Sequence, residues 1–175
     1  WARRFVEETG GKVPVRSKVN WEIITELVFP NLIRSLTLSN GSKYIALACD
    51  DSSVYVVEIP SWSVIIAKDL GAPVLSVVFS KNNERLAVGS ADGILCLIDP
   101  LEGWEAAGEI ESSASPVLTM DWCSKNLAVG RQDGSVSIYD SDQVYSNFCV
   151  ALVELSHKSP VRSVSFGASG RSLAV

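Results

Sequence analysis

The stretch "LAVGSADGILCLID", residues 86–99, places two short apolar segments on either side of a Gly-Ser-Ala-Asp-Gly sequence. Apolar segments of this length, rich in Leu, Val and Ile, are typical of β-strands. Asp92 and Gly93, which lie between the segments, tolerate the backbone conformations of a tight turn. A phosphate-binding loop would have to open a helix, whereas this turn joins two strands. The stretch therefore predicts a β-hairpin.

The hairpin is one copy of an internal repeat. Similar blocks are "YIALACDDS" (44–52) and "NLAVGRQDG" (126–134), and a further copy begins in "RSLAV" (171–175). An apolar residue opens a related stretch upstream of each block, in "IRSLTLS", "VLSVVFS", "VLTMDWC" and "VRSVSFG". These openers are Ile33, Val74, Val117 and Val161, at spacings of 41, 43 and 44 residues. A period in this range indicates a repeat architecture.

Large side chains mark fixed positions within each repeat. Five residues after the openers come Leu38, Phe79, Trp122 and Phe166. Upstream of the openers come Trp21, Trp62, Trp104 and Phe148. We expect these upstream aromatic residues to begin the outermost strands and to pack neighbouring units together.

Each period predicts four short strands, which in the second unit are residues 62–68, 74–80, 85–90 and 94–99. Several strands are apolar on both faces, so each small sheet must be covered on both sides. Radially stacked sheets satisfy this demand, which predicts an all-β fold, a β-propeller of four-stranded antiparallel blades. The repeats divide the chain into an N-terminal extension or linker (1–20) and a partial propeller (21–175). The expected units are 21–60, 61–102, 103–145 and 146–175.

The period, the "LAVGS-x-DG" and "LAVG-x-x-DG" blocks and terminal pairs such as Tyr139-Asp140 resemble the WD-repeat β-propeller family. This resemblance implies about three and a half blades of a seven-bladed ring, which the remainder of the chain or another subunit must close. No repeat has Trp-Asp in the position that names the family. The chain has Val57-Glu58, Ile98-Asp99 and Tyr139-Asp140 there.

The resemblance also implies structural roles for polar residues at the turns. In the family, an aspartate before the turn anchors a hydrogen-bond network that includes a histidine. The matching turn and network residues are Asp51, Asp92, Gly93, Asp133, Gly134 and His157. Because most of the other partners are changed, we expect the network to be reduced.

Composition restricts the functional classes. A net charge of −5 disfavours nucleic acid as a partner, because polyanion binding requires a basic patch. No apolar run approaches the length of a membrane span. The four cysteines form no C-x-x-C pair, and the single histidine disfavours most catalytic schemes. We therefore expect no enzyme activity, no metal and no cofactor, and an intracellular location in cytoplasm or nucleus.

Partner binding is expected on one face of the propeller. In a four-stranded meander, the loops between second and third strands share a face with the connections between blades, and such loops are common recognition sites. The predicted partner-binding residues are Asp50, Arg131, Gln132, Arg34 and Arg162. Their mixed charges favour a protein or peptide partner. The predicted function is a non-catalytic interaction scaffold or adaptor in an intracellular assembly. The alternative is a substrate- or cargo-recognition module of a larger enzyme complex, such as a ubiquitin ligase, or of vesicle-coat machinery.

Overall fold

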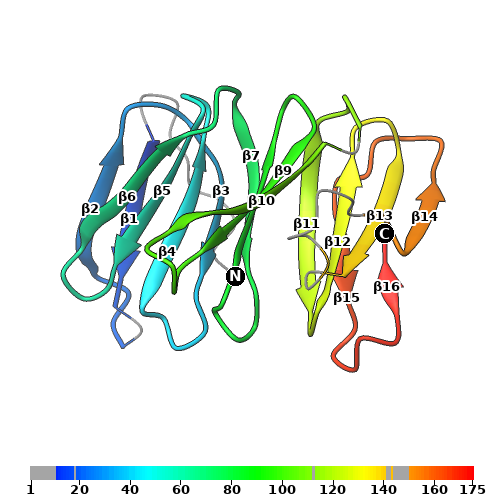
Figure 1. The fold of residues 1–175 in the computed structure, drawn as a ribbon. Coiled ribbons are helices and arrows are strands. Elements are labelled where there is room, and N and C mark those ends of the chain that lie inside the picture. The colour runs from blue at the N-terminus through cyan, green and yellow to red at the C-terminus, as the bar shows by residue number, and fades with distance from the viewer. Residues whose placement is uncertain (1–10, 18, 112, 141–142, 144–149) are drawn as a thin grey trace.

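Three complete four-stranded antiparallel sheets form the centre of the molecule (Figure 1). A computed structural model describes residues 11–17, 19–111, 113–140, 143 and 150–175. The first sheet contains β3 (Ile33–Leu38), β4 (Tyr44–Cys49), β5 (Ser53–Glu58) and β6 (Ser63–Asp69). The second contains β7 (Val74–Phe79), β8 (Leu86–Ser90), β9 (Ile94–Asp99) and β10 (Glu105–Glu111). The third contains β11 (Val117–Cys123), β12 (Asn126–Arg131), β13 (Ser135–Asp140) and β14 (Val153–Ser156). The predicted all-β fold with propeller-type blades is confirmed.

A two-stranded sheet lies at each end of this series. β15 (Ser165–Phe166) and β16 (Leu173–Ala174) supply the two inner strands of a fourth blade. β1 (Gly11–Arg16) pairs with β2 (Ile23–Phe29), and together they correspond to the two outer strands of a preceding blade. The segment 1–20, expected to be an extension or linker, thus contains a strand. β1 takes the place of a third strand, whereas the "LAVG" blocks lie in second strands, so β1 does not share their sequence.

The sequence repeat and the blade are offset by one strand. The second sequence unit was expected to contain residues 62–68, but this segment is β6 and pairs with β5 of the preceding sheet. The short link between β5 and β6 forms a hairpin, because antiparallel neighbours need only a tight turn. The outermost strand of each blade therefore comes at the start of the next sequence unit.

Close approach between blades explains the glycine of the "LAVG" block. A Cβ atom added to Gly89 would lie 2.3 Å from Cγ1 of Val117, the opener of the next blade. A Cβ on Gly130 would lie 2.6 Å from Cγ1 of Val161 in the same way. The repeat therefore places its smallest residue where the innermost strand of the following blade packs.

The expected packing role is observed for two aromatic markers and not for a third, since Trp62 packs against the cluster that includes Leu27 and Phe29 of β2. Trp104 lies edge-on to Tyr44 of the preceding blade, with ring centroids 5.1 Å apart, and also contacts Phe79. Trp21 is 70% exposed. Phe148 lies outside the described residues.

The strand order gives the arc two loop faces (Figure 1). The loops β4–β5, β8–β9 and β12–β13 and the connections between blades lie at one face, which we call the aspartate face. The loops β3–β4, β7–β8, β11–β12 and β15–β16 lie at the opposite face, which we call the basic face. Across the described part of the chain, no helix is long and apolar enough to cross a membrane.

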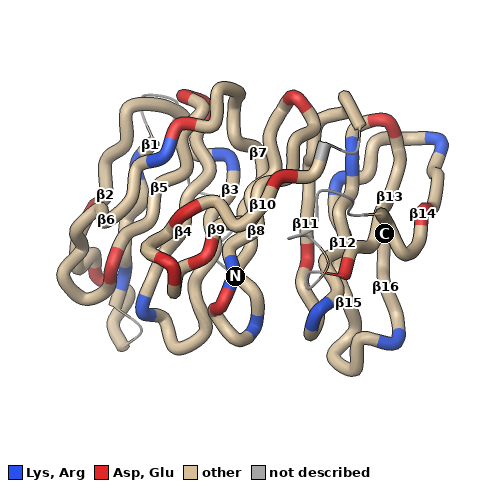
Figure 2. The backbone as a smooth tube through the Cα atoms, viewed as in Figure 1, with Lys and Arg blue, Asp and Glu red and all other residues tan. Residues whose placement is uncertain are grey.

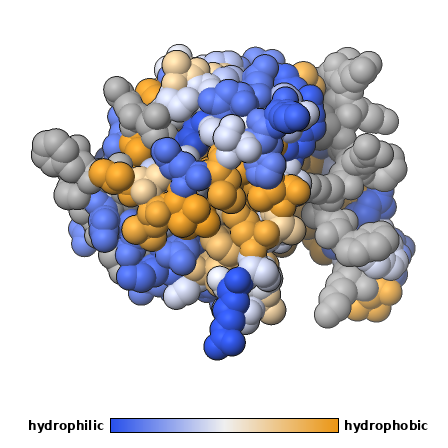
Figure 3. Space-filling model, turned by 90° about the vertical axis from the view of Figure 1, so that its right-hand side faces the viewer, coloured by the Kyte–Doolittle hydropathy of each residue, from blue (hydrophilic) through white to orange (hydrophobic). Residues whose placement is uncertain are grey.

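The C-terminal side of the arc is apolar in part. Val153, Leu155 and Val175 are each more than 40% exposed. Figure 3 shows this side of the molecule, with an apolar area bordered by hydrophilic residues. Both faces of the blades inside the arc are covered by neighbouring sheets, as the apolar character of their strands requires.

Candidate functional site

The aspartate face is built from three equivalent turns. In each one an aspartate Oδ1 accepts a hydrogen bond from the backbone N–H two residues later. The pairs are Ser53 to Asp51 at 3.0 Å, Ile94 to Asp92 at 3.3 Å and Ser135 to Asp133 at 2.9 Å. This Asx geometry lets the side chain close the turn locally. The aspartates therefore fix the shape of the loops from which a partner would be bound.

The residue after each aspartate adopts a left-handed backbone conformation. The φ angles are 89° at Gly93 and 90° at Gly134, while Ser52 takes the same position with φ 68°. Glycine is required at Gly93 for a second reason, because a Cβ there would lie 1.9 Å from the carbonyl oxygen of Ser113. At Gly134 it would lie 2.2 Å from the carbonyl oxygen of His157. The connection to the next blade thus runs directly against the turn.

Side chains near the turns extend the hydrogen bonding within each blade. The Tyr55 hydroxyl donates to Asp51 Oδ2 at 2.8 Å, and the Ser135 hydroxyl donates to Asp133 Oδ1 at 2.7 Å. The Ser90 hydroxyl lies against Asp92. Each network therefore remains local to its own blade.

Two of these aspartates are stabilised in the ionised form. At Asp51, burial raises the pKa, but the hydrogen bonds from Tyr55 and Ser53 outweigh it and leave the pKa below its usual value. At Asp133, the hydroxyl and backbone N–H of Ser135 lower the pKa. Burial and the bond to Asp51 raise the pKa of Tyr55, which keeps its hydroxyl protonated as a donor.

Arg34 and Asp50 form an ion pair at the edge of the first turn. Nε and Nη2 of Arg34 each lie 2.6 Å from a different carboxylate oxygen of Asp50, a two-pronged arrangement. Side-chain exposure is 50% for Arg34 and 22% for Asp50. The hydrogen bonds to Asp50 raise the pKa of the Arg34 guanidinium. Two residues predicted for partner binding are therefore joined and accessible on this face.

Arg131 does not lie on the surface, in contrast to the expectation. It is 1% exposed, and its Nη1 and Nη2 donate to the Ser137 hydroxyl at 2.8 Å and the Tyr139 hydroxyl at 3.1 Å. At the corresponding position, the second blade has Ser90 and the first has Cys49. Arg131 thus supports the third blade from within, where it cannot contact a partner.

Gln132 and Arg162 are exposed, and within the described residues neither side chain has a hydrogen bond or ion pair. Their backbones are fixed, because Gln132 N donates to the Pro116 carbonyl at 3.0 Å and the adjacent Val161 N donates to the Arg131 carbonyl at 3.0 Å. Free polar groups on an ordered backbone are suited to recognition.

His157 contributes to the turn through its backbone. Its N–H donates to the Gly134 carbonyl at 2.9 Å, while the side chain is exposed. Among the described residues, the imidazole has no hydrogen bond to the turn aspartate. The loop-to-turn link is therefore present, but it uses main-chain atoms.

The sequence interpretation missed the buried Arg131–Ser137–Tyr139 group and the cationic character of the opposite face. Each loop of the basic face contains Lys or Arg, namely Lys43, Lys81, Arg85, Lys125 and Arg171. The only acidic residue in these four loops is Glu84. Figure 2 shows basic segments along the lower edge of the arc, where these loops lie. The sequence signal for this face was a basic residue that recurs in every repeat, in the loop between the first and second strands.

Comparison with known proteins supports the repeat assignment. The family described as "WD domain, G-beta repeat" matches residues 67–99. A structure of Sqt1 from Chaetomium thermophilum has TM-score 0.79 and 17% identity, covering 90% of this chain and 45% of that chain. A chain in a structure of a mitotic checkpoint complex has TM-score 0.69 and 23% identity, covering 81% of this chain and 44% of that one. This chain spans less than half the length of these chains. No curated protein sequence matches it.

Proposed function

We propose that this chain is a non-catalytic scaffold for protein–protein interaction within an intracellular assembly, because residues 67–99 match a WD-repeat family and the chain folds into β-propeller blades. The family is widely used for protein interaction. One structural neighbour comes from a mitotic checkpoint complex. Support for a binding role therefore comes from the surface that this chain presents.

The observation that carries the proposal is the arrangement of the aspartate face. Of three turns with the same geometry, the first holds Asp50 next to its partner Arg34. The third holds Gln132 near Arg162, which follows the connection to the next blade. A protein surface gains specificity from opposite charges and amides on rigid loops, because such groups pay little ordering entropy on binding. The mixture of signs suits a folded partner or peptide more than a polyanion.

We also propose that further blades cover the apolar C-terminal side of the arc. The exposed Val153 and Leu155 resemble residues that neighbouring sheets cover elsewhere in the arc. We expect the remainder of the protein or another subunit to cover them, because burial of such apolar surface contributes roughly 25 cal/mol per Å².

The proposal can be tested by affinity purification of the chain followed by quantitative mass spectrometry. A double variant, Asp50→Lys with Arg162→Glu, reverses two charges of the aspartate face. We expect specific partners to be recovered at least about tenfold less efficiently. The matched control is Glu109→Lys, a charge reversal at an exposed position within strand β10.

The control should retain every partner. Unchanged recovery with the double variant, at an unchanged thermal unfolding midpoint, would contradict a role for the aspartate face. If the double variant changes the unfolding midpoint, a milder pair, Asp50→Asn with Arg162→Gln, separates loss of binding from loss of folding. This pair removes the charges without adding new ones.

A further inference from the structure

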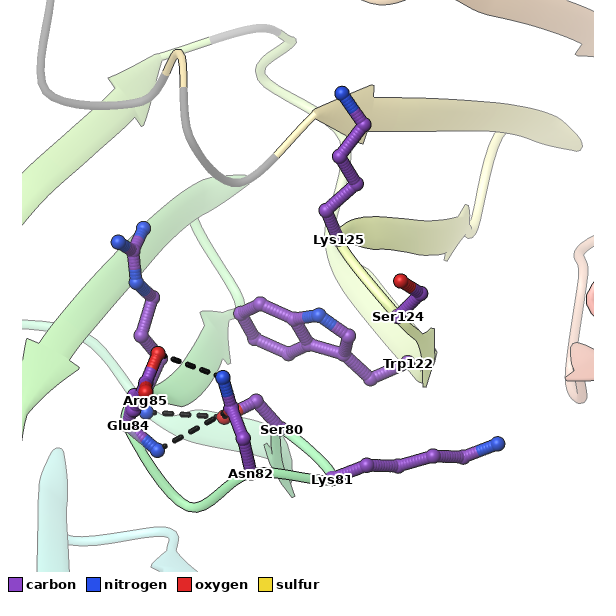
Figure 4. A pocket seen from close by; sticks show the side chains of 8 residues that line it. All are labelled: Ser80, Lys81, Asn82, Glu84, Arg85, Trp122, Ser124 and Lys125. Atoms are coloured by element: carbon purple, nitrogen blue, oxygen red, sulfur yellow. Dashed lines mark hydrogen bonds between the residues drawn. The ribbon is translucent and has the colours of Figure 1, made fainter.

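A pocket opens on the basic face between the second and third blades. It has a volume of about 390 Å³, within the range of small-ligand and peptide side-chain pockets. Its lining comes from the β7–β8 loop, the end of β11 and the β11–β12 loop, and includes Lys81, Asn82, Glu84, Arg85, Trp122 and Lys125. Figure 4 shows Arg85 and Lys125 extending on either side of the Trp122 ring.

The wall of the pocket is held in place by hydrogen bonds within the β7–β8 loop. The Ser80 hydroxyl donates to Asn82 Oδ1 at 2.7 Å and accepts from the Arg85 backbone N–H at 3.0 Å. Asn83 joins this loop to the preceding blade, since its Nδ2 donates to the Asn40 carbonyl at 2.6 Å. The pocket is therefore preformed by residues that bridge two blades.

A second pocket of about 360 Å³ borders the first. It is lined by Leu38, Asn40, Phe79, Ser80 and Lys81, so Ser80 and Lys81 belong to both. Leu38 is 50% exposed and supplies an apolar wall. The two pockets together offer an apolar subsite beside a cationic one.

The charges around the first pocket favour an anion. The Glu84 carboxylate accepts from the Asn82 amide at 2.6 Å, and Lys125 pairs with Asp140 at 2.8 Å. Lys81 is exposed and, within the described residues, has no carboxylate partner. Its ammonium lies 3.9 Å from Cys123 Sγ, and Lys81 lines both pockets. A cation without a carboxylate partner, placed on a preformed wall, attracts a negatively charged group.

We propose that this double pocket binds a short acidic peptide segment of a partner protein, with an apolar side chain at Leu38 and one or more carboxylates at Lys81. A long polyanion fits less well, because Glu102 lies in the β9–β10 loop of the second blade and the chain carries a net charge of −5. A peptide can place its acids only at the cationic subsite. This site lies on the face opposite to the one proposed above and does not depend on it.

The test measures fluorescence anisotropy with labelled ten-residue peptide pools. One pool carries four Asp or Glu residues and one Leu or Phe, and a matched pool has Asn and Gln in place of the acids. We expect the acidic pool to bind and the amide pool to bind at least about tenfold more weakly. Lys81→Glu should weaken acidic binding about tenfold, and Lys81→Gln should weaken it less. Leu38→Asp should weaken it through the apolar subsite.

Two controls separate this site from the aspartate face and from loss of folding. Arg162→Glu should leave peptide binding unchanged while affecting the partners of the aspartate face. The thermal unfolding midpoint of the Lys81→Gln variant should equal that of the unaltered chain. Equal binding of both pools, or no effect of either Lys81 variant, would overturn the proposal. Tighter binding of a twenty-nucleotide single-stranded DNA than of the acidic pool would also overturn it.

Discussion

The two loop faces of the arc are built in different ways. On the aspartate face, the three turns each have three residues and each is closed by its own aspartate, with the next blade resting against it. On the basic face, the loops differ in length, and Lys81 and Arg171 extend to solvent. The aspartate face therefore holds the blades in register, whereas the basic face is freer to present charge.

The largest difference between the faces should appear at their glycines. In Gly93→Ala, the new Cβ meets the Ser113 carbonyl at 1.9 Å and φ is 89°, so we expect a loss of about 3 kcal/mol in the free energy of unfolding. The matched change on the basic face is Gly41→Ala, where φ is 80° and no atom lies within 4 Å of the new Cβ. That change should cost about 1 kcal/mol from backbone strain alone. Urea denaturation measures the free energy of unfolding of both variants. Equal losses would show that the loops of the two faces constrain their glycines to the same degree.

A second comparison lies within the aspartate face, between its buried and exposed arginines. Arg131→Ala should lower the free energy of unfolding by about 2–3 kcal/mol, because it leaves the buried Ser137 and Tyr139 hydroxyls without their donor. Arg34→Ala should change it by less than about 1 kcal/mol, as expected for an exposed ion pair. Denaturation of both variants in urea gives the difference. A small effect at Arg131 would indicate that it is not part of the internal support.

The smallest expected effect is a pH dependence carried by the turn aspartates. The pKa values of Asp51 and Asp133 lie below the ordinary 3.8 in the folded chain. Their contribution to stability is therefore complete above the unfolded-state pKa and is lost as the pH falls through the lower folded-state pKa.

Asp51→Asn should thus cost about 1 kcal/mol at neutral pH and progressively less below about pH 4. Unfolding free energies measured from neutral pH to about pH 2.5 give this profile. Lys81→Ala on the basic face is the control and should leave the acid limb of the curve unchanged. An Asp51→Asn curve parallel to that of the unaltered chain would show that the turn bonds do not depend on ionisation.

Much of the local structure could be predicted from particular residues. The Asp92-Gly93 turn follows from an aspartate that bonds two residues ahead and a glycine that accepts positive φ, and both preferences act within four residues. The same holds for Asp133-Gly134. Strand β1 was missed because "GKVPVR" contains Pro14 and lacks the repeat pattern, while its pairing with β2 satisfies its backbone.

The repeat, the strand positions and the aspartate turns follow from the amino-acid sequence, since they depend on spacing and on hydrogen bonds between near neighbours. Only the tertiary structure decided that Arg131 is buried and Arg34 exposed, although both are arginines beside an equivalent turn. Exposure depends on the stacking of blades, which involves residues about forty positions apart. The cationic double pocket arises in the same way, because Leu38, Lys81 and Trp122 meet only when three successive blades are packed together.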